Sequence, residues 1–333
     1  LIYHMLKTAG LSVSMVTSNG AWIHDKEYNL NFHVTNPGSF PLQRFLRLAV
    51  RKDLSKNKNF LVLEVTSHGI DQHRIWGIPF AYAVITNITH EHLDYHKTYQ
   101  AYLKTKAKLL QKASVPIVNR DDMSYDYLMP LLTGKKVISY SLENNNADIT
   151  LKTIPFSTKL LGDYNKRNIL AAIAVVKQIG VSSDIIKNAI TTFHAPLGRT
   201  DIIFNDGFSV MIDFAHTPNA FTQILSSVRP QVKGKIIHVF GSAGKRDKTK
   251  RPLMGKASSQ FADVIILTAE DPRNESIQSI CKDIASGFIG KPVVFVIEDR
   301  KKAIEKALSI AKENDMVLLT GKGHEKSINY GRG

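Results

Sequence analysis

Residues 60–74 read FLVLEVTSHGIDQHR. The first four, Phe60–Leu63, form a short, continuous apolar run, which is typical of a strand that is buried in a parallel sheet. The sequence then changes abruptly to a carboxylate, Glu64, followed by hydroxyls and imidazoles. In open α/β sheets, ligands bind at the carboxyl ends of the strands. The stretch therefore predicts a core strand whose end carries a functional site.

The same alternation of short apolar segments with longer amphipathic ones recurs along the chain. It predicts an α/β fold with mostly parallel sheets built from strand–helix–strand units. The predicted strands are 60–63, 83–85, 115–118, 137–139, 209–212, 235–240, 264–268, 292–296 and 315–320. The predicted helices are 42–53, 98–112, 166–179, 183–192, 220–227, 251–260, 276–286 and 300–313, with a further amphipathic helix in the opening LIYHMLKTAG.

Two domains are expected in the 333 residues. Pro196, Gly198 and the polar turn at 205–207 mark a hinge, after which the strand–helix pattern restarts. The predicted domains are therefore residues 1–197 and 198–333.

Composition narrows the class of protein. Hydrophobic residues make up 43% and charged residues 22%, and no apolar run approaches the roughly 20 residues of a membrane span. The single cysteine, Cys281, excludes an internal disulfide framework and favours a reducing cytoplasm. The net charge of +15 suits either nucleic acid or small anions such as nucleotides. No nucleic-acid-binding module is present, so we expect neither a nucleic acid nor a membrane partner.

A polar residue or a glycine follows six of the predicted strands. These residues are Glu64, Asn87, Asp213, Gly241, Glu270 and Gly321. One such residue would carry little information because loops are generally polar. Six in the same register favour a site at the sheet edge.

Two further patterns suit a nucleotide. Residues 241–252, GSAGKRDKTKRP, form a glycine-rich and basic turn after a strand, which can bind an anion but can equally serve solubility. A carboxylate such as Glu64 and an imidazole such as His92 can hold Mg²⁺, although capping or solvent exposure explains each equally well. The helix that Thr98 is expected to cap carries several lysines, only one of which is expected to face a cleft.

Eight stretches, in this order and with suitable gaps, resemble the Mur ligase family, and most closely its tripeptide synthetase branch. They are LEVTSHGIDQHR, TNITHEHLDYHKTYQAYLKTKAKLL, LLGDYNKRNILAA, LGRT, DFAHTP, GSAGKRDKTKRPLMG, EDPR and GKGHE. The resemblance covers nearly the whole chain. It implies a central ATPase-like domain over residues 1–197 and a Rossmann-like C-terminal domain over 198–333 that binds the incoming amino acid. It also implies that a UDP-binding domain and a P-loop precede Leu1 and that the last strand and helix are missing, so this sequence alone is expected to be inactive.

The function that the resemblance implies is ATP-dependent amide formation in peptidoglycan synthesis. The enzyme would add a third amino acid, meso-diaminopimelate, to UDP-N-acetylmuramoyl-L-Ala-D-Glu through an acyl phosphate. ATP and Mg²⁺ are the implied cofactors. The implied enzyme is a cytoplasmic monomer, and its partners are the UDP-N-acetylmuramoyl-dipeptide and the diamino acid.

The resemblance also assigns residues to roles. Metal ligands would be Glu64, His92 and, if carbamylated, Lys106. Catalytic residues would be Lys106, Arg199 and His216. ATP contacts would be Asn87, Asn165, Asn168, Arg199 and Asp213. Contacts to the UDP-muramoyl-peptide would be Thr35, Asn36, Thr66, Gln72 and Arg74. Contacts to the incoming amino acid would be Arg246, Asp271, Arg273, Gly321 and Glu325.

The choice of amino acid depends on one departure from the family pattern. Arg273 suits the distal carboxylate of diaminopimelate through bidentate pairing, and Glu325 suits its distal ammonium. This chain, however, reads EDPR where the branch reads DNPR, and Asp271 is expected to repel that carboxylate. A lysine-adding ligase, or another ligase of the superfamily, therefore stays open. So does a non-catalytic nucleotide-binding protein, while nucleic-acid binding is the least favoured alternative.

Overall fold

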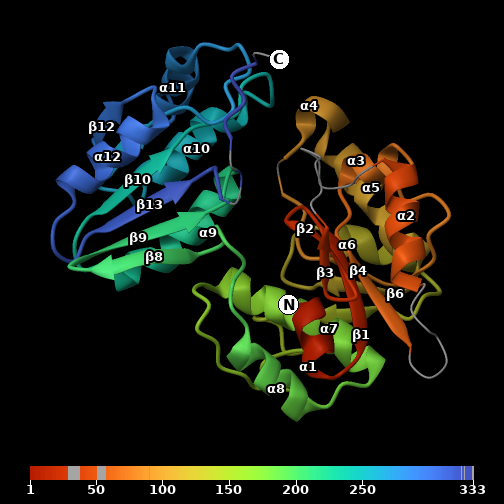
Figure 1. Cartoon of the computed structure of the whole chain (residues 1–333). Coiled ribbons are helices and arrows are strands. Elements are labelled where there is room, and N and C mark those ends of the chain that lie inside the picture. The colour runs from red at the N-terminus through yellow and green to blue at the C-terminus, as the bar shows by residue number, and fades with distance from the viewer. Residues whose placement is uncertain (29–37, 51–57, 90, 324, 326, 332–333) are drawn as a thin grey trace. The chain divides into compact units, whose positions relative to one another are not determined.

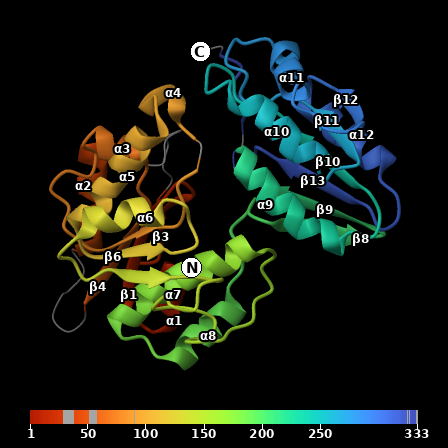
Figure 2. The same cartoon turned by 180° about the vertical axis from the view of Figure 1, so that it is seen from behind.

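The computed structural model describes residues 1–28, 38–50, 58–89, 91–323, 325 and 327–331 (Figure 1; Figure 2 gives the opposite view). The chain forms two compact units. Unit 1 comprises Leu1–Ile88, His96–Lys159 and Tyr164–Phe193, and unit 2 comprises Thr89–Tyr95, Leu160–Asp163 and His194–Gly333. The units interleave along the chain because two short segments from the first 163 residues belong to unit 2. The predicted boundary between residues 197 and 198 stays a prediction.

Unit 1 contains two sheets. The first has the order β3-β2-β1-β4 and consists of β1 (Ser12–Thr17), β2 (Gly20–Ile23), β3 (Lys26–Tyr28) and β4 (Asn59–Leu63). In it β1 and β4 are parallel, whereas β1, β2 and β3 pair antiparallel. The second sheet is parallel, with the order β5-β6-β7, and consists of β5 (Phe80–Ile85), β6 (Ala113–Asn119) and β7 (Ile138–Tyr140).

One hydrophobic core joins both sheets of unit 1. Val16 of β1, Ile85 of β5 and Val118 of β6 pack in the same buried cluster as Leu103 and Leu110 of helix α5. Full burial of each such side chain contributes about 1.5–3 kcal/mol. The helices associated with this unit are α1 (Ile2–Thr8), α2 (Ser39–Val50), α3 (Ser67–Asp71), α5 (Tyr99–Lys112), α6 (Tyr125–Leu128), α7 (Asp163–Ile179) and α8 (Ser183–Thr192).

Unit 2 is built on one six-stranded sheet with the order β12-β11-β10-β13-β9-β8. Its strands are β8 (Asp201–Asp206), β9 (Phe208–Asp213), β10 (Ile236–Phe240), β11 (Val264–Leu267), β12 (Val293–Val296) and β13 (Met316–Thr320). All neighbours are parallel except β8 and β9, which form an antiparallel hairpin. The hairpin turns at Gly207, whose φ of 71° favours glycine.

Helices cover both faces of the sheet in unit 2 (Figures 1 and 2). They are α9 (Pro218–Val228), α10 (Lys250–Ser259), α11 (Ile277–Ala285) and α12 (Arg300–Ile310). A further short helix, α4 (Leu93–His96), comes from the segment Thr89–Tyr95 of this unit and the residue after it. Side chains of a strand alternate between the two faces. Val239 of β10 packs with Ala303 of α12, whereas His238 and Phe240 contact the ring of Phe221 of α9. Therefore α12 covers one face, and α9 covers the other together with its neighbour α10.

The α/β class is confirmed, and each predicted strand and helix is present within a few residues of its expected bounds. Residues 51–53 of the predicted helix 42–53 lie outside the described residues. The prediction missed β1, β2, β3 and β8, which supply the antiparallel pairs. Within the part of the chain that the structure describes, no helix has the length and apolar character to span a membrane.

Candidate functional site

The loops that follow β9, β10, β11 and β13 of unit 2 carry most of the predicted residues of that unit. Because these four strands are parallel neighbours, their carboxyl ends lie along the same edge of the sheet. The loop segments concerned are 214–217, 241–249, 268–276 and 321–323.

His216, in the loop after β9, is held by two acceptors. Its Nδ1 lies 3.0 Å from the carbonyl oxygen of Phe214, and its Nε2 lies 3.1 Å from Oε1 of Glu91. Both ring nitrogens can donate at once only in the imidazolium form. Burial opposes that charge, but the hydrogen bond to Glu91 outweighs it and raises the pKa of His216. Likewise, burial opposes the charge of Glu91, yet the bond from His216 lowers the pKa of Glu91 to about 2. The sequence had not singled out Glu91.

Glu270, three residues after the end of β11, is buried, with 8% of its surface exposed. Its Oε2 is buried and has no hydrogen-bond partner among the described residues. Burial raises the pKa of Glu270 to about 7, against the attraction of Lys250, His216, Arg300 and Lys322. Glu270 is therefore a buried acid among cations, at a position for which the sequence predicted only a strand-end polar residue.

Asp271 is paired with two cations. Lys322 Nζ lies 2.6 Å from its Oδ1, the backbone N–H of Asn329 donates to the same oxygen at 2.9 Å, and Arg273 Nη2 lies 4.0 Å from Oδ2. Burial opposes the negative charge, but these contacts lower the pKa of Asp271. The negative charge that was expected to repel a substrate carboxylate is thus balanced by Lys322. Together, Asp271, Lys322 and Arg273 therefore carry a net charge of +1, which comes from Arg273.

The basic loop after β10 is tied to the segment that carries Asp271. The N–H of Gly244 donates to the carbonyl oxygen of Asp271 at 3.0 Å, and the N–H of Lys245 donates to Oε2 of Glu275 at 2.9 Å. The Arg246 guanidinium is half-exposed, with Nη1 3.9 Å from Oδ2 of Asp94. Two segments that are 27 to 30 residues apart in the sequence are therefore joined by these hydrogen bonds.

Two residues near the predicted hinge have structural contacts. Asp213 is buried at the end of β9, where its Oδ1 accepts the N–H of Ala215 at 2.7 Å and its Oδ2 accepts that of Thr200 at 2.8 Å. The guanidinium of Arg199 lies 4.3 Å from the ring centroid of Phe214, a cation–π distance. Both side chains hold the start of unit 2 together, and their predicted contacts to ATP stay predictions.

In unit 1, Glu64 follows β4 as expected. Its Oε2 accepts hydrogen bonds from the backbone N–H of Ser18 at 2.7 Å and from the Ser18 hydroxyl at 2.9 Å. Thr66 caps α3 by accepting the N–H of Gly69 at 3.0 Å, and Gln72 is the C-terminal cap of that helix. These local contacts fix the loop backbone at the strand end. Arg74 lies two residues beyond and is partly buried.

The lysines of helix α5 differ in their exposure to solvent. Thr98 caps the helix as predicted, since its hydroxyl accepts the N–H of Ala101 at 3.1 Å. Lys104 and Lys108 are exposed, whereas Lys106 is partly buried and its Nζ lies 5.2 Å from the ring centroid of Tyr102. Lys106 is thus the one of these three described lysines that is partly buried.

The remaining predicted residues are placed as follows. Asn87 is exposed after β5, and its Oδ1 accepts a bond from the Thr86 hydroxyl at 3.2 Å. Asn165 and Asn168 are partly buried in the first turns of α7. Glu325 is exposed and its Oε2 accepts the N–H of Gly323 at 2.9 Å. The predicted substrate residues Thr35 and Asn36 lie outside the described residues.

The predicted metal ligands are divided between the units. Glu64 and Lys106 belong to unit 1, and His92 belongs to unit 2, where its Nε2 lies 3.7 Å from Oε1 of Glu91. Among the described residues, no group of three or more His, Cys, Asp and Glu side chains is arranged to hold a metal ion. The joint metal site therefore stays a prediction.

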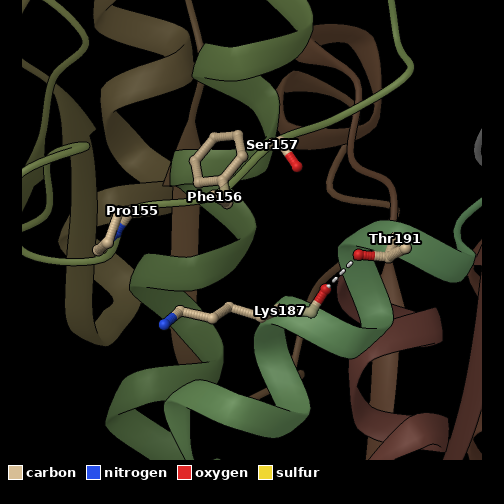
Figure 3. A pocket seen from close by; sticks show the side chains of 5 residues that line it. All are labelled: Pro155, Phe156, Ser157, Lys187 and Thr191. Atoms are coloured by element: carbon tan, nitrogen blue, oxygen red, sulfur yellow. Dashed lines mark hydrogen bonds between the residues drawn. The ribbon is translucent and has the colours of Figure 1, made fainter.

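A separate pocket of about 350 Å³ lies in unit 1 between α8 and the segment before α7 (Figure 3). It is lined by Pro155, Phe156, Ser157, Lys187 and Thr191. The hydroxyl of Thr191 donates to the carbonyl oxygen of its own helix at Lys187, 3.0 Å away, and is engaged in that bond (Figure 3). None of the predicted site residues lines this pocket, so we assign it no part in the site.

Comparison with known proteins matches the chain to two family models. The Mur ligase middle domain matches residues 1–176, and the glutamate ligase domain of Mur ligases matches residues 198–323. The chain belongs to the Mur ligase family. The predicted resemblance to this family is confirmed, and the α/β fold of both units is that of the Mur ligases.

Three individual Mur ligases show the degree of similarity. The UDP-N-acetylmuramoyl-L-alanyl-D-glutamate–2,6-diaminopimelate ligase of Aquifex aeolicus is 40% identical over 292 residues, covering 81% of this chain and 60% of that protein. The UDP-N-acetylmuramyl-tripeptide synthetase of Borreliella afzelii is 36% identical over 362 residues, covering 99% and 70%. A solved structure of a diaminopimelate ligase of the same kind has a TM-score of 0.63 at 29% identity, covering 99% and 72%. The chain thus spans 60–70% of the length of these two curated relatives.

Sequence reasoning missed several residues that the structure brings to the sheet edge of unit 2. They are Glu91, Lys250, Glu275, Arg300 and Lys322. Glu91 had a weak signal because it neighbours His92. Lys250 lies in a basic stretch in which every cation looks alike. Arg300 and Lys322 lacked any local signal because their roles arise from contacts between distant segments.

Proposed function

We propose that the chain is part of an ATP-dependent ligase that joins meso-diaminopimelate to UDP-N-acetylmuramoyl-L-alanyl-D-glutamate in peptidoglycan synthesis. The observation that carries the choice of amino acid is the pairing of Asp271 with Lys322 beside Arg273. This pairing leaves one positive charge for a distal substrate carboxylate, which lysine lacks. The similarity to ligases that are named for diaminopimelate supports the same choice.

The proposed reaction has two steps. The terminal carboxylate of the dipeptide attacks the γ-phosphate of ATP, which gives an acyl phosphate and ADP. The amine of the amino acid then attacks the acyl carbon, and phosphate leaves from the tetrahedral intermediate. The first step brings a carboxylate against the phosphates of ATP, and the second develops negative charge on the tetrahedral intermediate, so fixed cations are needed in the site. In unit 2, the hydrogen bond to Glu91 favours the imidazolium form of His216, and Lys250 is anchored beside it through a 2.9 Å bond to the His216 carbonyl oxygen.

We assign the binding groups according to the family resemblance. ATP would be contacted by Asn87, Asn165, Asn168, Arg199 and Asp213. The UDP-muramoyl-peptide would be contacted by Thr35, Asn36, Thr66, Gln72 and Arg74. The amino acid would be contacted by Arg246, Asp271, Arg273, Gly321 and Glu325.

Magnesium is the proposed metal cofactor. Glu64 and His92 would hold it, together with Lys106 if that residue is carbamylated. The exposed carboxylate of Glu64 has the oxygen chemistry that Mg²⁺ prefers, so the residue fits the ion. When bound, the ion would neutralise phosphate charge. The proposed enzyme acts in the cytoplasm as a monomer.

A ligation assay tests the amino acid choice. The protein is expressed from its full gene and supplied with ATP, Mg²⁺ and the UDP-dipeptide, and ADP release is compared between diaminopimelate and lysine. We expect at least about a hundredfold preference in kcat/KM for diaminopimelate, because lysine would leave the cation unpaired. Arg273→Ala should remove most of that preference, whereas Lys312→Ala, at an exposed position, should keep it. Equal use of both amino acids would refute diaminopimelate specificity. ADP release that does not depend on either amino acid would refute the proposed ligase activity.

A further inference from the structure

Glu270 has an oxygen that nothing in its surroundings satisfies. The residue is buried, and Oε2 has no hydrogen-bond partner among the described residues. A buried polar atom without a partner destabilises the folded state, and more so when it is charged. Such atoms are rare in native proteins and call for an explanation, such as a ligand that supplies the missing partner.

The backbone of Gly321 approaches this oxygen closely. Gly321 has a φ of 87°, and a Cβ at this position would lie 2.9 Å from Oε2 of Glu270. Gly321 is fixed there, because its N–H donates to the carbonyl oxygen of Ala215 at 2.8 Å. Gly321 is also one of the positions proposed to contact the incoming amino acid. The unsatisfied oxygen therefore faces the part of unit 2 where that amino acid is expected.

The cations near Glu270 do not satisfy it. Lys250 donates to the carbonyl oxygen of His216, Arg300 donates to two other carbonyl oxygens, and Lys322 is paired with a different carboxylate. His216 itself is held between a carbonyl oxygen and a carboxylate. All four act on Glu270 only through their charge. They favour the carboxylate, yet burial still holds the pKa of Glu270 at about 7, so both of its forms are populated near neutral pH.

We propose that Glu270 is the catalytic base that binds the ammonium of the incoming amino acid through Oε2 and accepts its proton. The proposal rests on the proposed ligase function. The ammonium transfers one proton to the carboxylate, which becomes a carboxylic acid. The freed lone pair forms the N–C bond to the acyl phosphate, and the C–O bond to phosphate breaks with its electron pair on the phosphate. The second proton lost by the nitrogen leaves with the phosphate, and the amide keeps the third.

The test separates the two steps of the reaction. Glu270→Gln keeps the size of the side chain but removes the base, and the protein is expressed from its full gene. Formation of the acyl phosphate is followed with hydroxylamine, which is unprotonated at neutral pH and yields a hydroxamate without needing a base. Ligation is followed with diaminopimelate. We expect the variant to form hydroxamate within about threefold of the wild type while its ligation rate falls by at least about a hundredfold, the usual contribution of a general base.

Controls distinguish the base from a structural residue. Glu313→Gln changes an exposed carboxylate in the same unit and should leave both rates unchanged. Glu270→Asp retains a carboxylate and should recover part of the ligation rate. The pH profile of ligation should show an acid limb in the wild type that is absent in Glu270→Gln. Thermal unfolding of each variant checks that it is folded at the assay temperature.

The outcomes are separable. The proposal is overturned if the wild type forms hydroxamate and Glu270→Gln ligates at a rate within about fivefold of the wild type. The proposed ligase function would then still stand. Loss of hydroxamate and ligation together in a folded variant would also overturn it, because Glu270 would then act before the amine enters. A wild type that forms neither hydroxamate nor amide would overturn the proposed function, and the role of Glu270 with it.

Discussion

The carboxylate of Glu275 holds the guanidinium of Arg251 through two hydrogen bonds, one of 2.8 Å to Nη1 and one of 2.9 Å to Nη2. Arg251 is completely buried and also donates to Asp283 on α11 at 2.8 Å. The same carboxylate accepts the N–H of Lys245 in the basic loop. One buried ion pair therefore joins α10, the loop after β10 and the loop after β11. We infer that it keeps Arg246 in place, because Arg246 is the next residue along the basic loop.

Removing the charge of Glu275 should loosen the basic loop. In Glu275→Gln, Arg251 stays buried with one carboxylate fewer, which should lower the free energy of unfolding by about 3 kcal/mol. The N–H of Lys245 loses a charged acceptor at the same time. We expect trypsin to cleave after Lys245 and Arg246 at least about tenfold faster under native conditions, since local opening governs such cleavage.

Mass spectrometry of the fragments identifies the cleaved bonds. Glu313→Gln, which removes an exposed carboxylate before β13, is the matched control and should be cleaved like the wild type. Equal cleavage of Glu275→Gln and the control would show that the ion pair does not hold the loop.

Gly321 and Gly290 provide a matched pair of substitutions. Both have positive φ, 87° and 71°, but a Cβ at Gly321 meets Oε2 of Glu270 at 2.9 Å whereas a Cβ at Gly290 meets nothing within 4 Å. Gly290→Ala should cost about 1 kcal/mol of stability from backbone strain alone. Gly321→Ala should cost at least about 1 kcal/mol more, because the extra methyl group overpacks a buried site.

Urea unfolding measures both costs. The double variant Gly321→Ala/Glu270→Ala should recover the additional loss, since the clashing carboxylate is gone. An additional loss that persists in the double variant would place the clash elsewhere.

The fold was predictable from sequence wherever burial alone determined the pattern. Strands β10, β11 and β13 are buried along their whole length, and their continuous apolar runs predicted them. Strand β1 escaped prediction because Ser14 is buried in it and accepts the N–H of His24 at 3.4 Å, which disturbs the apolar pattern. Strand β8 escaped because Ile203 and Phe204 are exposed on an edge whose pairing with β9 is a tertiary property.

The sequence could predict which segments of the candidate site are charged, but it could not predict the contacts of the individual side chains. Lys250 and Arg251 are adjacent in one basic run, yet Lys250 reaches the carbonyl oxygen of His216 while Arg251 is a buried structural cation. No local pattern separates these two roles. The compensation of Asp271 by Lys322 joins residues 51 positions apart. The sequence therefore indicated the charge at Asp271 but not its partner.

His238 should make unit 2 sensitive to acid. Its ring is buried, with Nδ1 2.8 Å from the hydroxyl of Ser258 and Nε2 2.8 Å from that of Thr320, and burial together with Arg300 lowers its pKa to about 3. Below about pH 6.5, His238 is protonated in the unfolded chain but stays neutral in the folded chain. This difference lowers the free energy of unfolding by about 1.4 kcal/mol for each pH unit.

Unfolding in urea at pH 7.5 and pH 5.5 tests this expectation. In His238→Gln, the loss of stability between the two pH values should be smaller than in the wild type by about 1 kcal/mol. His194→Gln, at an exposed position, is the control and should behave like the wild type. An unchanged loss in His238→Gln would mean that this ring is not the acid-sensitive group.

The pairing of Lys322 with Asp271 should govern affinity for diaminopimelate in the proposed ligase. Lys322→Met removes the cation that balances Asp271, and Arg273 then faces an uncompensated carboxylate. Binding of a substrate carboxylate should weaken by about tenfold, which corresponds to about 1.4 kcal/mol. In the double variant Lys322→Met/Asp271→Asn both charges are gone, and the net charge around Arg273 returns to that of the wild type. Affinity should therefore recover to within about threefold.

The KM for diaminopimelate, with the KM for ATP as an internal control, measures this effect. A change confined to the amino acid supports charge balance, whereas parallel changes in both constants would indicate a general disturbance of unit 2. If the double variant binds diaminopimelate no better than Lys322→Met, then Asp271 does not oppose the substrate carboxylate. Lys322 would then have to contact the substrate itself, and the pairing at 2.6 Å would have to open on binding.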